Sequence, residues 1–121
     1  MPIKKILIVD DSPTERHMQT EMLTKAGYQV VAAESGEQGV AMAKSEKPDM
    51  VLMDVVMPGM NGFQACRAIT TDEATKSIPV ILCTTKNQET DKVWGLRQGA
   101  KDYVTKPVDT AELLAKIKAL G

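Results

Sequence analysis

The sequence predicts an α/β fold in which helices cover both faces of one parallel, five-stranded sheet. Short, nearly uninterrupted apolar runs recur along the chain, and polar stretches of helix length separate them. Continuous apolar runs are typical of strands that are buried on both faces, as they are in parallel sheets. Strands that alternate with helices at this spacing need right-handed crossovers, which make neighbouring strands parallel.

Five runs have the length and the composition of buried strands. We expect them at Lys5–Val9, Gln29–Ala33, Met50–Asp54, Pro79–Cys83 and Asp102–Val104. Polar residues stand at or just after the ends of these runs. The strands should therefore be buried along their length and reach the surface only at their ends.

Capping signals mark where the intervening helices begin and end. Ser12–Glu15 combines an N-cap serine, a proline at the first helical position and a capping-box glutamate. Ser35 and Asp109 open two further helices with the same type of pattern. Gly27 and Gly99 stand where a left-handed residue would end the first and fourth of five helices.

The size and charge of the chain limit the classes of function. Its 121 residues match one domain, so we expect a single unit over residues 1–121 with no output domain. A net charge of −1 with scattered lysine and arginine favours neither nucleic acid nor an anionic membrane. The sequence has neither a signal-peptide pattern nor an apolar run of membrane-spanning length, which favours a soluble, cytoplasmic protein.

The sulfur-containing residues are interpreted mainly as packing residues. Cys66 and Cys83 are not closely spaced, so they predict neither a metal site nor a redox pair. Most methionines should fill the core, but we expect Met57 and Met60, in the loop after the third strand, to be exposed.

The polar residues at the strand ends predict a site. Asp10 and Asp11, Asp54, Thr84 and Lys106 follow or end four of the five strands. The carboxyl ends of parallel strands meet at one edge of a sheet, which is where open α/β sheets bind ligands. Three carboxylates gathered there repel one another, and a hard divalent cation relieves that repulsion. Oxygen ligands without histidine or cysteine favour Mg²⁺ or Mn²⁺ over zinc.

Such a site suits a phosphoryl group. Mg²⁺ commonly shares its ligands between one or two carboxylates and a phosphate oxygen. Lys106 would supply a positive charge, and Thr84 a hydroxyl donor, to the other phosphoryl oxygens. Asp54 is the candidate phosphoryl acceptor because it stands alone on the predicted middle strand, whereas Asp10 and Asp11 are adjacent and can share a cation.

The whole chain resembles response-regulator receiver domains, the CheY-like family with a flavodoxin-like fold. The motifs that carry the resemblance occur in the family's order: Val9-Asp10-Asp11-Ser12, Met53-Asp54, Met57-Pro58, Asn61-Gly62, Thr84, Tyr103 and Lys106-Pro107. The resemblance implies the strand order 2-1-3-4-5, a cis bond before Pro107, and phosphoryl transfer to Asp54 from a histidine kinase's phosphohistidine. It also implies that Asp11, Asp54 and the backbone carbonyl of Val56 bind Mg²⁺, with Asp10 contributing directly or through water.

The segment 84–100 resembles, more narrowly, the receivers of twitching motility. That likeness implies a chemosensory kinase as partner, a pathway that governs type IV pili, and a monomer acting as messenger or phosphate sink. Phosphorylation would draw Thr84 and Tyr103 inward and reshape a partner surface on the fourth helix, fifth strand and fifth helix, which includes Trp94. From the sequence alone, Tyr103 could instead be a half-buried sheet residue, and Trp94 a packing residue.

Three positions near the predicted site are candidates for tuning its phosphoryl chemistry. Val56 follows Asp54 by two residues, and Lys86 follows Thr84 by two. We expect the side chains of Val56 and Lys86 to tune the attack of water on the acyl phosphate. Thr85 stands where the family usually carries alanine or glycine, and its bulk could narrow access to the site.

Two other functions remain open at this point. One is a pseudo-receiver, an interaction module that works without phosphorylation. The other is a Mg²⁺-dependent phosphohydrolase with Asp54 as its nucleophile. Phosphohydrolases of the haloacid-dehalogenase type carry a second aspartate two residues after the nucleophile, where this chain has Val56. We therefore expect no enzyme in the usual sense, only a protein that catalyses its own phosphorylation and dephosphorylation.

Overall fold

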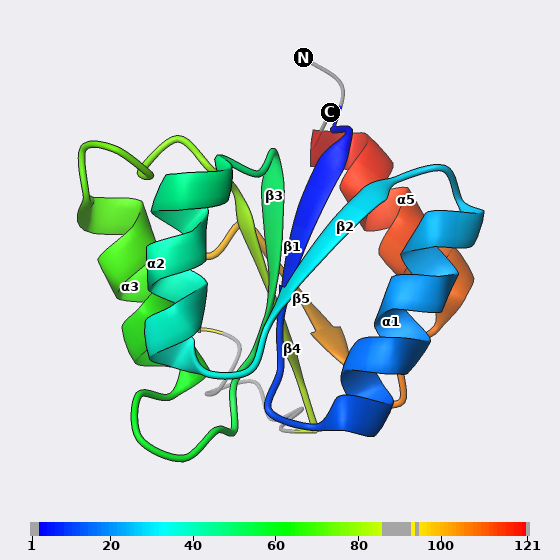
Figure 1. Cartoon of the computed structure of the whole chain (residues 1–121), viewed down its shortest axis with the longest axis horizontal. Helices are drawn as coiled ribbons and strands as arrows, with labels where there is room; N and C mark the ends of the chain where they lie inside the picture. Colours follow the sequence, from blue (N-terminus) through cyan, green and yellow to red (C-terminus); the bar gives the residue numbers. More distant parts are fainter. Residues whose placement is uncertain (1–2, 86–92, 94, 121) are drawn as a thin grey trace.

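A computed structural model describes residues 3–85, 93 and 95–120 and shows alternating strands and helices (Figure 1). The strands are β1 Lys5–Val9, β2 Gln29–Ala33, β3 Met50–Asp54, β4 Val80–Thr84 and β5 Asp102–Thr105. The bounded helices are α1 Pro13–Lys25, α2 Gly36–Glu46, α3 Gly62–Thr71 and α5 Thr110–Leu120. Helical backbone is also described at residues 93 and 95–97, within the expected fourth helix.

The five strands form one parallel sheet in the order β2-β1-β3-β4-β5, as expected. Helices α1 and α5 lie against one face of the sheet, and α2 and α3 lie against the other (Figure 1). Strand β3 is central, with β1 and β4 as its neighbours. The fold is therefore the predicted doubly wound arrangement.

The boundaries of two strands, β4 and β5, differ slightly from the prediction. Strand β4 begins at Val80 rather than Pro79, whose nitrogen has no hydrogen to donate to a ladder. It continues to Thr84, which pairs with Thr105, so β5 is also one residue longer than expected. The backbone nitrogen of Lys106 donates to the Thr84 carbonyl at 2.8 Å and extends this pairing by one further bond.

The core consists of two apolar layers, one on each face of the sheet. Along β1, Ile6 and Ile8 pack on the α1/α5 side, whereas Leu7 and Val9 pack on the α2/α3 side. All four side chains are fully buried. Because side chains alternate along a strand, a sheet covered on both faces needs an unbroken apolar run. This requirement accounts for the pattern in the sequence.

The predicted helix boundaries agree with the local hydrogen bonds. Ser12 and Ser35 are N-caps whose side chains accept backbone hydrogens from Glu15 and Gln38. A cap that was not predicted from the sequence is the reciprocal capping box that Asn61 and Gln64 form at the start of α3. In the segment described after β4, Gly99 has a φ of +97°, a left-handed conformation that glycine adopts without strain.

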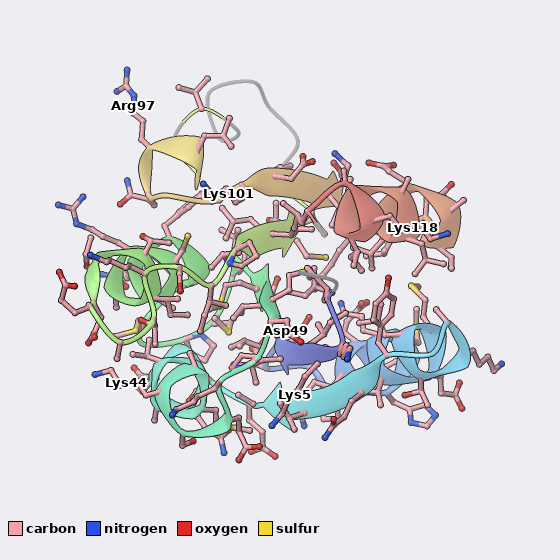
Figure 2. All side chains as sticks on the ribbon, turned by 90° about the horizontal axis from the view of Figure 1, so that it is seen from above. Lys5, Lys44, Asp49, Arg97, Lys101 and Lys118 are labelled. Carbon is pink, nitrogen blue, oxygen red and sulfur yellow. The ribbon has the colours of Figure 1, made fainter. Side chains whose placement is uncertain are left out.

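An acidic residue, Asp49, lies at the amino-terminal edge of the sheet, and backbone hydrogen bonds stabilise its carboxylate. The Asp49 carboxylate accepts hydrogen bonds from the backbone nitrogens of Lys4 and Lys5, each at 2.9 Å. Asp49 and Lys5 are labelled in Figure 2. The Lys5 hydrogen bond, followed by that from Lys4, lowers the pKa of Asp49. Among the described residues, no helix is both long and apolar enough to span a membrane.

Candidate functional site

The opposite, carboxyl-terminal edge of the sheet gathers the predicted polar residues. Asp10 and Asp11 follow β1 directly, and Asp54 and Thr84 are the last residues of β3 and β4. Lys106 follows β5 directly. The strands are parallel and in register here, with Val9 opposite Met53, Asp54 opposite Cys83 and Thr84 opposite Thr105. The parallel sheet thus brings residues far apart in the chain to one edge.

Three carboxylates form a close cluster at this edge. Asp10, Asp11 and Asp54 each place an oxygen atom so that the three atoms lie within 4.8 Å of one another. Asp10 and Asp54 are only 1% and 5% exposed, whereas Asp11 is exposed. The cluster therefore has a buried floor and a side that is open to solvent at Asp11.

Lys106 lies between the two buried carboxylates. Its Nζ atom is 2.9 Å from Oδ2 of Asp10 and 3.2 Å from Oδ1 of Asp54. Burial alone would lower the pKa of Lys106, but the hydrogen bond with Asp10 and the charges of Asp10 and Asp54 outweigh it and raise the pKa. The lysine is therefore charged at neutral pH. The other Asp10 oxygen accepts the backbone hydrogen of Ser12 at 2.9 Å.

One lysine does not neutralise the whole cluster. Burial, followed by the negative charge of Asp10, raises the pKa of Asp54 to about 6 despite the opposing effect of Lys106. Burial disfavours the charged form of Asp54, and repulsion from Asp10 adds to that effect. A cation bound beside Asp54 would stabilise the ionised carboxylate against both.

The donor set at this edge suits a hard divalent cation. Its candidate ligands are the carboxylate oxygens of Asp10, Asp11 and Asp54, which Mg²⁺ and Mn²⁺ prefer. The nearby Cys83 is buried, and burial raises the pKa of its thiol to about 12. Its side chain packs in the core layer on the α1/α5 side of the sheet, and the cluster of Asp10, Asp11 and Asp54 does not include it.

A compact loop from Val55 to Asn61 borders the cluster. The Gly62 nitrogen donates to the Val55 carbonyl at 2.9 Å, and an added Cβ on Gly62 would lie 2.1 Å from the Asp54 carbonyl oxygen. Only glycine fits there. Val56, whose carbonyl is the expected metal ligand, has a side chain that is 55% exposed.

The expectation that Met57 and Met60 are exposed was wrong. Met57 is 7% exposed and belongs to the core layer on the α2/α3 side of the sheet. Met60 is partly buried and packs against the same layer. These two side chains therefore pack in the core although the loop backbone is irregular, whereas Val56 in the same loop is exposed.

Of the predicted switch and tuning residues that are described, Val56, Thr84 and Thr85 lie at this edge, whereas Tyr103 lies inside β5, opposite Leu82. Thr84 is fully buried. Tyr103 is 7% exposed and belongs to the core layer on the α2/α3 side of the sheet. Tyr103 is thus more deeply buried than a half-buried sheet residue. Thr85 is exposed. Lys86 and Trp94 lie outside the described residues, and their roles stay predictions.

Two side chains near the site were not predicted from the sequence. Arg16 of α1 donates through Nη1 to the Asp10 carbonyl at 2.8 Å, and its Nη2 lies 3.6 Å from Oε1 of Glu34. Glu37 of α2 accepts the backbone hydrogen of Met60 at 3.1 Å. Charged residues near the starts of helices are common, so the residue types carry no local signal for these contacts.

Comparison with known proteins agrees with this geometry. Residues 6–118 match the response regulator receiver domain family. The chain is 65% identical over 116 residues to Protein PilH of Pseudomonas aeruginosa, covering 96% of both chains. It is also 43% identical to the phosphate regulon transcriptional regulatory protein PhoB of the same species, and the match covers 51% of the length of PhoB.

Solved structures show the same likeness. The chemotaxis protein CheY4 of Vibrio cholerae superimposes with a TM-score of 0.91 at 32% identity, covering 98% of this chain and 99% of that one. The receiver domain of the sensor histidine kinase PA1611 from Pseudomonas aeruginosa, solved with a magnesium ion in its active-site cleft, gives 0.89 at 32% identity. It covers 97% of this chain and 96% of that one. This chain belongs to the response regulator receiver domain family.

Proposed function

We propose that this chain works as a stand-alone receiver that accepts a phosphoryl group on Asp54 in a Mg²⁺-dependent reaction. The observation that carries the proposal is the cluster of Asp10, Asp11 and Asp54, with Lys106 within 3.2 Å of Asp54. Receiver domains work with histidine kinases in phosphorelays, and phosphorylation on aspartate is general in the family. The match to almost the full length of PilH supports the stand-alone form.

The reaction is a transfer between two side chains. A carboxylate oxygen of Asp54 attacks the phosphorus of the kinase's phosphohistidine, a P–O bond forms, and the P–N bond breaks. The imidazole takes up a proton as it leaves, which yields neutral histidine and an acyl phosphate on Asp54. Asp54 must be ionised to attack, and a pKa of about 6 leaves it mostly ionised at neutral pH even without a cation.

The residues of this edge have separate tasks in that transfer. Asp11, Asp54 and the Val56 carbonyl would hold Mg²⁺, with Asp10 beside them, and Mn²⁺ fits the same oxygen donors. The cation supplies positive charge that stabilises the charge on the phosphoryl oxygens during transfer. Lys106 contributes a second positive charge, and Thr84 contributes a hydroxyl at the end of the neighbouring strand.

The protein would catalyse only its own phosphorylation and dephosphorylation. A phosphohydrolase of the alternative type needs an acid–base group close to its nucleophile. At the position two residues after Asp54, this chain presents Val56, an exposed apolar side chain that cannot carry a proton. The alternative of a pseudo-receiver is less favoured, because the acidic cluster and Lys106 are assembled at one edge.

The likeness to PilH supports a role in the control of twitching motility through type IV pili. In this role the chain would receive phosphoryl groups from a chemosensory histidine kinase and work as a cytoplasmic monomer. It would act as a messenger or as a phosphate sink. Its partner surface would lie on the fourth helix, β5 and α5, where Val93 and Leu96 are exposed apolar residues.

Phosphotransfer from the chemosensory kinase of the same organism tests the proposal. We expect the wild type to gain one phosphoryl group in Mg²⁺, as measured by intact mass, and Asp54→Asn to gain none. Asp49→Asn, which changes an aspartate at the opposite edge, is the matched control and should be labelled normally. A short-lived adduct would favour the sink, and a long-lived one the messenger. An unlabelled wild type would favour the pseudo-receiver.

A further inference from the structure

The amino end of α2 is tied to the loop between β3 and α3. Oε1 of Glu37 accepts the backbone hydrogen of Met60 at 3.1 Å, although the two residues are 23 positions apart in the chain. The backbone hydrogen bond within Glu37 itself, followed by that from Met60, lowers the pKa of this carboxyl group. The side chain is therefore an anion at neutral pH, the form that accepts such hydrogen bonds most strongly.

Two glycines allow this approach. An added Cβ on Gly36 would lie 2.7 Å from the Met60 carbonyl oxygen, so the backbones of α2 and the loop are almost in contact. An added Cβ on Gly59 would lie 3.2 Å from Oε1 of Glu37, and Gly59 has a φ of +72°. The link between Glu37 and Met60 thus belongs to a closely packed junction.

Two hydrogen bonds restrain the loop. The Gly62 nitrogen donates to the Val55 carbonyl at 2.9 Å, which brings the two ends of the loop together. The Met60 nitrogen, near the carboxyl-terminal end of the loop, donates to Glu37. Between these two attachments lie Val56, with its side chain turned out to solvent, and Met57, with its side chain in the core.

We propose that Glu37 is a positioning residue that restricts the loop, and with it the Val56 carbonyl, before a cation binds. This inference rests on the proposed function, because it concerns the same metal site. A loop that is ordered in advance loses less conformational entropy when its carbonyl becomes a ligand. Glu37 itself touches neither the cation nor the phosphoryl group in this account. Its effect is carried through the Met60 backbone.

Two measurements on purified protein test this role. Isothermal titration of Mg²⁺ gives the dissociation constant of the metal alone, and hydrogen exchange gives the protection of the Met60 amide. Glu37→Ala should weaken Mg²⁺ binding about three- to tenfold, less than the ten- to hundredfold typical of groups that hydrogen-bond a ligand side chain directly. The Met60 amide should exchange faster in the same variant. Glu37→Gln keeps an acceptor oxygen and should stay close to wild type in both measurements.

Glu112→Ala is the matched control, because Glu112 is also an exposed acidic residue in the first turn of a helix. It removes the same favourable charge from a helix start without touching the loop, and it should leave Mg²⁺ binding unchanged. Wild-type affinity in Glu37→Ala would overturn the inference while leaving the metal site intact, and so would unchanged exchange at Met60. Failure of the wild type to bind Mg²⁺ would instead contradict the proposed function, and the inference with it.

Discussion

Replacing Asp54 by asparagine should stabilise the metal-free protein at neutral pH. Asp54 is 5% exposed and shares one lysine with Asp10, so its negative charge is unfavourable in the folded state. The free-energy cost of this buried charge raises the pKa of Asp54 from 3.8, the value of a free aspartate, to about 6. An amide of nearly the same shape removes the charge, and Lys106 keeps its bond to Asp10.

The magnitude follows from the shift in pKa. The difference between 6 and 3.8 is about 2.2, and each pKa unit corresponds to about 1.4 kcal/mol, so the ionised carboxylate costs roughly 3 kcal/mol. That pKa already includes the attraction of the carboxylate to Lys106. The amide must still bury its own polar groups, so about 1–3 kcal/mol of net stabilisation is expected. Because the folded-state pKa of Asp54 is raised, its contribution to stability is most favourable below the unfolded value and is lost as pH rises through 6.

Urea denaturation of wild type and Asp54→Asn in EDTA measures this effect. At about pH 7.5 the midpoint of the variant should be higher by roughly 0.5–1.5 M, and near pH 5 about half of the difference should remain. Asp49→Asn is the control with the opposite sign, because hydrogen bonds from the backbone lower the pKa of Asp49. A less stable Asp54→Asn variant, or a difference that does not shrink at low pH, would show that the buried charge of Asp54 does not destabilise the fold.

Three further perturbations follow from the same site. A Mg²⁺ concentration of about 100 times Kd should raise the unfolding free energy of the wild type by about 2.7 kcal/mol, and Asp54→Asn should respond much less in the same urea titration. Lys106→Met leaves Asp10 and Asp54 without their shared cation, so it should destabilise the metal-free fold by roughly 3 kcal/mol and raise the Asp54 pKa, which carboxyl NMR would detect. Val56→Asn should change the decay rate of the aspartyl phosphate, as followed by intact mass, and decay at the wild-type rate would exclude tuning by this side chain.

The sheet and its acidic edge were predictable because local patterns determine them. An apolar run such as Ile6–Val9 has no polar residue to place on a solvated face, so it predicts a strand covered on both sides. Once the strands are parallel, the residues that end them must share an edge. The pairing of Asp54 with Cys83 and of Thr84 with Thr105 shows that edge in the structure.

The supports of the site were not predictable in the same way. Arg16 and Glu37 are charged residues near the starts of helices, where a charged side chain is usually interpreted as solvated, and the negative charge of Glu37 also suits the helix dipole. Their contacts with the Asp10 carbonyl and the Met60 nitrogen depend on how separate elements pack in space. The burial of Met57 was missed for a related reason, since an irregular loop has no periodicity that shows which side faces the core.

The most direct test of the account is to locate the phosphoryl group. The protein would be incubated with a small phosphodonor and Mg²⁺, and borohydride would then reduce any acyl phosphate before peptide mass spectrometry. We expect reduction at Asp54 alone, dependent on Mg²⁺ and absent in Asp54→Asn. Labelling at Asp10 or Asp11, or no labelling in the presence of Mg²⁺, would contradict it.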